Sequence, residues 1–162
     1  MRKVAFALHL VFSSLIIFSC QSGSSNKEVV RDRSHKQMDA TETIGFYKDM
    51  SLDDALELAR QQNKHVFIDF YADWCAPCKM MERDVFTHQS IYPFFNERFI
   101  NVKMDVDDRS VGSEAAAKYN ISAMPTLMLI HPEKDVIMKE RGYRDANGLL
   151  KAAQAALARA NQ

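Results

Sequence analysis

Two cysteines three residues apart, Cys75 and Cys78, are the residues of this sequence most suited to chemistry. They follow an apolar, strand-like run and precede a helical pattern. At this spacing the second thiol lies one helical turn from the first, so the pair can close a small disulfide and open it again. This predicts a two-electron redox centre. Half of a zinc site has the same spacing, so a copper- or zinc-binding carrier module that uses these cysteines is the alternative, beside two incidental cysteines.

A redox role requires a lowered pKa at one thiol, because the thiolate is the nucleophile in disulfide exchange. Cys75 falls at the expected start of a helix, where unpaired backbone N–H groups and the helix dipole stabilise negative charge. Pro77 fits the first helical turn, where its missing N–H is not needed. We therefore expect the Cys75 thiolate to attack a disulfide in a partner protein and Cys78 to resolve the mixed disulfide. Run backwards, the same site oxidises a dithiol.

Asp69 is an acid within an apolar strand, six residues before the first cysteine. If it is buried, desolvation raises its pKa, and a carboxyl group poised near neutrality can take the proton from Cys78. If the strand lies at the edge of a sheet, the same side chain faces water. The residue pattern alone leaves both alternatives open.

The segment 69–79, which contains Trp-Cys-Ala-Pro-Cys, resembles the active-site segment of the thioredoxin superfamily. Met124-Pro125-Thr126 resembles the cis-proline loop of that family. Within the superfamily the chain is similar to membrane-tethered, DsbD-like thiol:disulfide interchange domains, on the basis of Ala-Asp-Trp-Cys at 72–75 and the acidic stretch 104–108. The resemblance covers roughly residues 51–159.

The resemblance implies roles for the residues around the cysteines. Asp69 matches the family's buried acid, and Lys103 matches the lysine that pairs with it. A cis Pro125 would place the Met124 backbone where an extended substrate can pair with it as an added strand. Trp74 would shield the thiol and contact partners. The alternatives are a solvated surface lysine for Lys103 and a core tryptophan for Trp74.

The same resemblance implies which residues bind the substrate and whether a cofactor is needed. The substrate-binding residues would be Trp74, Pro77, Met124 and Pro125. No bound cofactor is expected beyond the redox-active disulfide of Cys75 and Cys78, and no metal ligands are assigned.

The elements that must position these residues alternate between strand and helix patterns, which predicts an α/β protein. With the resemblance, we expect a thioredoxin fold, a central mixed β-sheet of four to five strands flanked by helices. The expected strands are 65–71, 99–106, 126–130 and 136–140, with a possible edge strand at 43–47. The expected helices are 51–63, 75–99 with a break near Tyr92-Pro93, 110–119 and 147–159.

The N-terminus has the pattern of an export signal. A positive start precedes a broken apolar run at 4–18, and Ile17-Phe18-Ser19-Cys20 resembles the lipobox of bacterial lipoproteins. We predict a lipoprotein signal peptide at 1–19, a lipid-anchor cysteine (Cys20) with a flexible linker at 20–45, and a thioredoxin-like domain at 46–162. The alternatives are a cleaved signal with an incidental cysteine, or an uncleaved anchor.

Composition limits the remaining functions. The chain has 162 residues with 21 basic and 21 acidic side chains, so no charge excess points to nucleic acid. Three cysteines are too few for a disulfide-rich scaffold. We expect a monomer held by lipid on the periplasmic side of the cell envelope. It would act as a reductant of oxidised exported proteins, with electrons from a membrane thiol-reductant donor.

Overall fold

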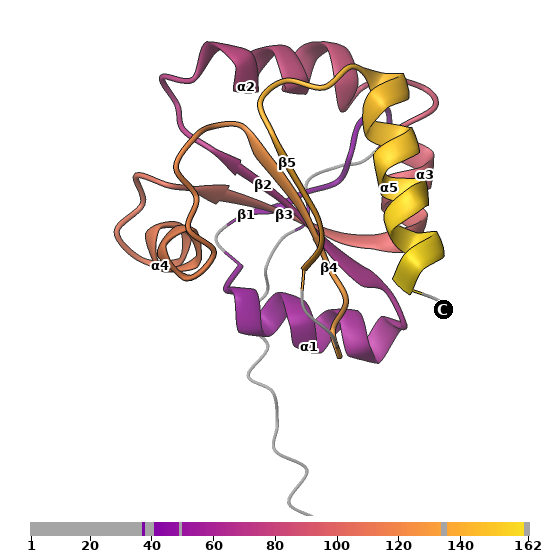
Figure 1. Ribbon diagram of the computed structural model, residues 1–162, viewed down its shortest axis with the longest axis horizontal. Coiled ribbons are helices and arrows are strands. Elements are labelled where there is room, and N and C mark those ends of the chain that lie inside the picture. The colour runs from indigo at the N-terminus through magenta and orange to yellow at the C-terminus, as the bar shows by residue number, and fades with distance from the viewer. Residues whose placement is uncertain (1–36, 38–40, 49, 134–135, 161–162) are drawn as a thin grey trace, which may run out of the picture. The chain divides into compact units, whose positions relative to one another are not determined.

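The fold is built on one five-stranded sheet. The computed structural model describes residue 37 and residues 41–48, 50–133 and 136–160 (Figure 1). The strand order is β1-β3-β2-β4-β5. The strands are β1 (Tyr47–Lys48), β2 (His65–Tyr71), β3 (Phe99–Asp105), β4 (Thr126–Ile130) and β5 (Val136–Arg141). The predicted signal peptide, Cys20 and most of the predicted linker lie outside the described residues.

The sheet is mixed, as predicted, and the thioredoxin fold is confirmed. β2 is parallel to β3 and antiparallel to β4, and both β1 and β5 pair at the outside. The first strand differs from the expectation of 43–47, because only Tyr47 and Lys48 pair with β3. The preceding Ile44 is fully buried in the core instead.

Helices cover both faces of the sheet. On one face α1 (Leu52–Gln62) and α4 (Val111–Lys118) pack against Val66, Ile68 and Phe70 of β2. On the other face α3 (Tyr92–Arg98), α5 (Ala146–Ala160) and the helix after Cys75 pack against Phe67. Because successive side chains of a strand point to opposite faces, Asp69 shares the face of Phe67 and points toward the cysteine helix.

The predicted helix 75–99 is three separate elements. It begins as α2 (Ala76–Met80), widens into a π-helical turn η1 (Met81–Val85), and leaves helical geometry before α3 begins at Tyr92. A break is therefore present at 86–91, next to the expected position near Tyr92-Pro93, but the proline does not cause it. Pro93 lies in the first turn of α3, where backbone N–H groups have no partner within the helix. The missing N–H of proline is therefore no loss there, and Pro93 starts a helix rather than ending one.

Local contacts explain where other elements begin. The Ser51 hydroxyl caps α1 by accepting the Asp54 N–H at 3.1 Å. Gly112 lies so close to the end of β3 that a Cβ atom at this position would be 1.8 Å from the Asp105 carbonyl oxygen, so only glycine fits here. This close approach fixes the loop between β3 and α4.

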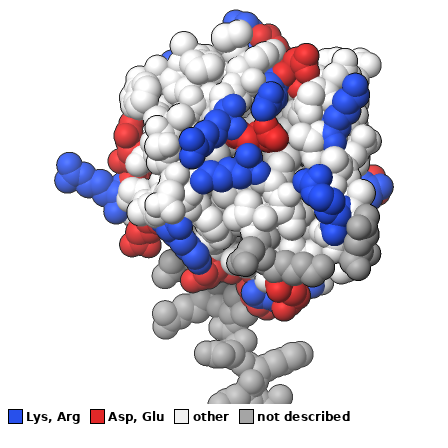
Figure 2. Space-filling view, in the orientation of Figure 1, with Lys and Arg blue, Asp and Glu red and all other residues white. Residues whose placement is uncertain are grey.

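The surface carries charges of both signs. Figure 2 shows Lys and Arg side chains with Asp and Glu among them on the same face. The outer strand β5 carries exposed Lys139 and Arg141, and charged side chains on an edge strand disfavour pairing with another chain. None of the helices that the structure describes is both long and apolar enough to cross a membrane.

Candidate active site

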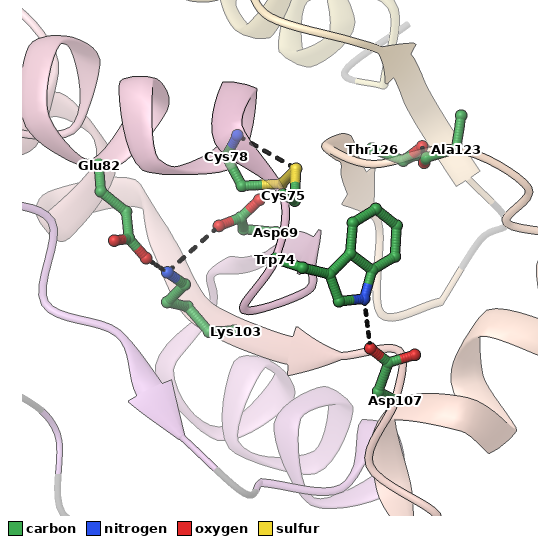
Figure 3. The surroundings of a disulfide bond; sticks show 9 residues. All are labelled: Asp69, Trp74, Cys75, Cys78, Glu82, Lys103, Asp107, Ala123 and Thr126. Carbon is green, nitrogen blue, oxygen red and sulfur yellow. Dashed lines mark hydrogen bonds and ion pairs between the residues drawn. A yellow bond between two sulfur atoms is a disulfide. The ribbon is translucent and has the colours of Figure 1, made fainter.

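Cys75 and Cys78 form a disulfide at the start of α2, with their Cα atoms 5.3 Å apart (Figure 3). Both residues are buried, at 3% and 2% exposure. Cys75 is the N-cap of α2, and its sulfur accepts the Cys78 N–H at 3.2 Å. Pro77 is half-buried in the first helical turn. A thiolate formed on Cys75 would be held by this N–H and by the helix dipole.

Asp69 lies next to the disulfide (Figure 3) and is 1% exposed. Its strand, β2, lies in the centre of the sheet rather than at an edge. Of the two alternatives for Asp69, a buried acid or a side chain that faces water, the structure therefore shows the buried acid. In the described structure neither carboxylate oxygen has a hydrogen-bond partner. Burial raises the pKa of Asp69 to about 6, against the opposing effect of Lys103. This carboxyl group can therefore bind and release a proton near neutral pH.

Lys103 is paired with Asp69 by strand register and by charge. The two residues are opposite each other in the β2–β3 ladder, and the ammonium nitrogen lies 3.6 Å from Asp69 Oδ2. Lys103 is itself buried, and burial lowers its pKa although Asp69 acts in the other direction. Its ammonium also lies 4.3 Å from the ring centre of Tyr71. The solvated-lysine alternative does not apply.

A third charged residue, Glu82, completes this cluster. Its carboxylate forms an ion pair with Lys103 (Figure 3). The Glu82 side chain is 48% exposed, so Lys103 bridges a buried and a half-exposed carboxylate. A cavity of about 190 Å³ is lined in part by Glu82 and Lys103, and neither cysteine lines it.

Sequence reasoning missed Glu82. The available signal was its position four residues after Cys78, which on a helix places both on one side. The π-helical turn that carries Glu82 has no comparable sequence signal.

Trp74 stands at the surface beside the disulfide. It is 68% exposed, so it is not a core tryptophan. Its indole N–H donates to Asp107 Oδ2 at 2.7 Å, which fixes the ring in place (Figure 3). Asp107 belongs to the acidic stretch noted in the sequence, but no role had been assigned to it.

The loop before β4 closes the other side of the site. The Met124–Pro125 peptide bond is cis, and Met124 packs against Ala72 and the two cysteines. The loop is held by the Thr126 hydroxyl, which donates to the Ala123 carbonyl at 2.7 Å. The substrate-binding roles of Met124 and Pro125 remain predictions.

The geometry thus brings together eight predicted site residues: Asp69, Trp74, Cys75, Pro77, Cys78, Lys103, Met124 and Pro125. Within the described residues, no group of three or more His, Cys, Asp or Glu side chains is arranged to hold a metal ion. The arrangement combines a nucleophilic sulfur, a resolving sulfur and a buried proton acceptor, which is what disulfide exchange requires.

Comparison with known proteins agrees with this geometry. The model of the family described as thioredoxin-like matches residues 47–132. The thiol:disulfide interchange protein DsbD of Pseudomonas fluorescens is 32% identical over 102 residues, which are 61% of this chain and 17% of DsbD. Thioredoxin 1 of Chlorobaculum tepidum is 42% identical over 73 residues, 45% of this chain and 66% of that protein. The chain thus spans less than two thirds of each of these relatives.

A solved structure adds to these relatives. A putative disulphide-isomerase from Bacteroides thetaiotaomicron has a TM-score of 0.63 and 34% identity, covering 72% of this chain and 94% of that one. Family match, fold and cysteine geometry agree. The chain belongs to the thioredoxin-like family, and its domain is that of a thiol:disulfide oxidoreductase with Cys75 and Cys78 as the redox pair.

Proposed function

We propose that this protein is an exported, membrane-anchored thiol:disulfide oxidoreductase that reduces disulfides in other exported proteins. The observation that carries the proposal is the buried disulfide at a helix N-terminus with the buried Asp69 carboxyl group behind it. A structural disulfide has no use for an adjacent acid whose burial raises its pKa to about 6.

The reaction is a two-step exchange. The Cys75 thiolate attacks one sulfur of the partner's disulfide, and the other partner sulfur leaves as a thiolate. Cys78 then gives up its proton to Asp69 and attacks the Cys75 sulfur, which releases the second partner sulfur. The partner gains two electrons, and Cys75 and Cys78 become the disulfide.

Export and anchoring rest on the N-terminal sequence. The Ile17-Phe18-Ser19-Cys20 pattern supports signal cleavage before Cys20 and a lipid on its thiol. Residues 21–40 of the linker that follows would have a root-mean-square reach of roughly 25 Å if they are flexible. A monomeric domain on such a tether would work at the periplasmic side of the cell envelope. Cys75 and Cys78 would then be its only free thiols.

The direction of electron flow is the remaining part of the proposal. A reductant must be reduced in turn, so we propose a membrane thiol-reductant donor as the second partner. The similarity to DsbD of Pseudomonas fluorescens, a thiol:disulfide interchange protein, supports exchange with other proteins. The same cysteines would serve a metal carrier less well, since the Asp69–Lys103 pair has no purpose there.

Reduction of insulin by dithiothreitol tests the activity with the full-length chain. We expect the wild type to accelerate reduction and Cys75→Ser to abolish the acceleration. Cys78→Ser should instead accumulate a mixed disulfide that migrates as a larger species without reductant. Equal activity of Cys75→Ser and wild type would disprove the proposed chemistry. A reduction potential more oxidising than that of glutathione would disprove the reducing direction.

Anchoring is tested separately in a bacterial host with radiolabelled palmitate. We expect label on the wild type and none on Cys20→Ala. Label on both, or on neither, would contradict a lipid at Cys20 and would leave the redox activity intact.

A further inference from the structure

The Lys103 side chain places a positive charge in the interior, at 7% exposure. An ammonium group is costly to remove from water unless attractive groups surround it. Two carboxylates supply part of this attraction, because Asp69 Oδ2 lies 3.6 Å from the ammonium nitrogen and Glu82 also pairs with it (Figure 3). Lys48, which is opposite Lys103 in the β1–β3 ladder, repels the ammonium and acts against them.

Two aromatic rings also lie close to this ammonium. The ring centre of Tyr71 is 4.3 Å from the nitrogen, and that of Phe46 is 5.7 Å from it. The face of an aromatic ring carries partial negative charge and attracts a cation within about 6 Å, more strongly where water is excluded. Both rings therefore stabilise the charged form of Lys103 at this position.

Strand geometry explains the position of Tyr71. It follows Asp69 by two residues on β2, so both side chains point to the same face of the sheet. Lys103 is opposite Asp69 on β3, which makes Tyr71 its diagonal neighbour. Tyr71 also packs against the buried cluster that contains the two cysteines. One ring thus contacts both the redox pair and the cation.

Phe46 reaches the same ammonium from a different part of the chain. It is buried, at 3% exposure, and lies just before the residues 47–132 that match the family model. The Ile44 N–H donates to the Phe86 carbonyl at 3.0 Å, which fastens this segment to the end of η1. The Phe46 and Phe86 rings are in edge contact, with centroids 5.2 Å apart. These contacts hold the Phe46 ring in place beside Lys103.

A ring differs from a carboxylate because it attracts the ammonium without neutralising it. The charge of Lys103 therefore remains available to Asp69, whose pKa it lowers against the larger effect of burial. Two further carboxylates act on this charge, the paired Glu82 and the more distant Asp73. Glu82 is half-exposed and competes with Asp69 for the ammonium. The rings favour the buried position of the cation without competing for its charge.

We propose that Tyr71 and Phe46 are positioning residues for the resolving step. Their rings hold the charged Lys103 ammonium beside Asp69, and this sets the pH range in which Asp69 accepts a proton from Cys78. The inference rests on the proposed function, because it concerns the proton acceptor of the same reaction. Without the rings the ammonium would lose its charge or turn away, and in both cases Asp69 would keep its proton to a higher pH.

Carbon-13 NMR of the Asp69 carboxyl group tests the proposal without turnover. The full-length, oxidised chain is labelled at its aspartate carboxyl carbons, and the Asp69 signal is identified by its absence from Asp69→Asn. We expect a wild-type titration midpoint at about pH 6. Tyr71→Leu should move the midpoint upward by about half a pH unit, because a cation–π contact changes the proton affinity of an ammonium by about two- to fivefold.

Further variants separate the ring from the rest of the side chain. Tyr71→Phe keeps the ring and should keep the wild-type midpoint, whereas Tyr71→Met lacks a ring and should behave as Tyr71→Leu does. Phe46→Leu should move the midpoint in the same direction but by less, since its ring is farther from the ammonium. Tyr92→Leu, which changes a half-buried tyrosine on α3, is the matched control and should cause no shift.

A double variant tests whether Tyr71 acts through Lys103. In a Lys103→Met background, adding Tyr71→Leu should produce no further shift of the Asp69 midpoint. An equal shift with and without the lysine would show that Tyr71 acts on Asp69 directly, and would overturn the inference. An unchanged midpoint in both Tyr71→Leu and Tyr71→Met would overturn it as well, as would an equal shift in Tyr71→Phe.

The pH profile of the resolving step connects these midpoints to the reaction. In an active chain the profile of Tyr71→Leu should move upward by the same amount as the NMR midpoint. A profile that stays in place while the midpoint moves would overturn the positioning role. The NMR titration does not depend on the reaction, so a wild type that shows the expected midpoints but does not reduce insulin would contradict the proposed function alone.

Discussion

The two sides of the disulfide differ in nearly every physical respect. On the exposed side, Trp74 is 68% exposed and is held by a surface hydrogen bond to Asp107. On the buried side, Asp69 and Lys103 are 1% and 7% exposed, and burial shifts both pKa values toward the neutral forms. One disulfide thus has an exposed aromatic ring on one side and a buried charged pair on the other.

This contrast separates two functions. We propose that residues on the exposed side contact partners without altering the proton equilibrium of the site. Residues on the buried side set that equilibrium and cannot touch a partner. Mutations on the exposed side should therefore change the apparent affinity for proteins, and those on the buried side should change pH dependence and stability.

The largest effect is expected on the buried side. Asp69→Asn removes the proposed acceptor for the Cys78 proton, and general-base catalysis of this kind contributes about a hundredfold or more. At neutral pH we expect the resolving step to slow by about that factor, measured in single-turnover stopped flow at saturating substrate. Asp53→Asn, an exposed change on α1, is the control and should leave the rate unchanged. A resolving rate in Asp69→Asn within twofold of the wild type would contradict the role of Asp69.

The same substitution should change stability in a pH-dependent way. The pKa of Asp69 is raised from 3.8 to about 6 on folding, so the folded protein binds this proton more tightly. The stability that protonated Asp69 contributes is fully present below pH 3.8, and it is lost as the pH rises through about 6. Between about pH 4.5 and about pH 8, oxidised wild type should lose about 2 kcal/mol relative to Asp69→Asn.

Urea unfolding at the two pH values measures this difference. Asp53→Asn again serves as the control, because its side chain is exposed. Parallel stability curves for wild type and Asp69→Asn would show that the burial of Asp69 does not disfavour its charge.

On the exposed side we expect a smaller effect that depends on substrate size. Trp74→Ala should raise the KM for insulin about tenfold, because truncated tryptophans at contact sites typically cost one to two kcal/mol. Asp107→Asn keeps the ring but weakens its anchor, so it should raise the KM about threefold. The reaction rates that give these KM values are measured by thiol alkylation followed by gel shift. A small disulfide such as oxidised glutathione should react equally with all three proteins, and a loss there would assign Trp74 to the chemistry itself.

The smallest effects should come from the residues around Lys103. Lys103→Met removes the cation that lowers the pKa of Asp69, so the pH midpoint of the resolving step should move upward. Glu82→Gln frees Lys103 to approach Asp69, so the midpoint should move downward. Opposite shifts in the two pH profiles are the expected signature. Shifts of the same sign would contradict the bridging position of Lys103.

Much of the fold was predictable from the pattern of neighbouring residues in the sequence. The nearly continuous apolar run 65–71 predicted β2 with its observed bounds, and 126–130 did the same for β4. The Trp-Cys-Ala-Pro-Cys segment with the Met-Pro-Thr loop predicted the fold and the chemistry. These features are encoded by neighbouring residues, so a single sequence reveals them.

The parts that sequence reasoning missed depend on contacts between distant segments. Glu82 meets Lys103 across 21 positions, and Asp107 meets Trp74 across 33. The connection between β5 and α5 is placed by hydrogen bonds from the Gly142 N–H to Pro125 and from the Arg144 N–H to Met81, both distant in sequence. The helix break was expected close to its observed place but for a different reason, since Pro93 is compatible with either the end or the start of a helix.

The measurement that tests the account most directly is the pH profile of the resolving step in the wild type and in Asp69→Asn. The wild-type rate should rise as the pH increases through about 6, because Asp69 must be ionised to accept the Cys78 proton. In Asp69→Asn this inflection should be absent. An inflection near this pH that persists unchanged in Asp69→Asn would show that another group receives the proton, and would contradict the division between a contact side and a proton-binding side.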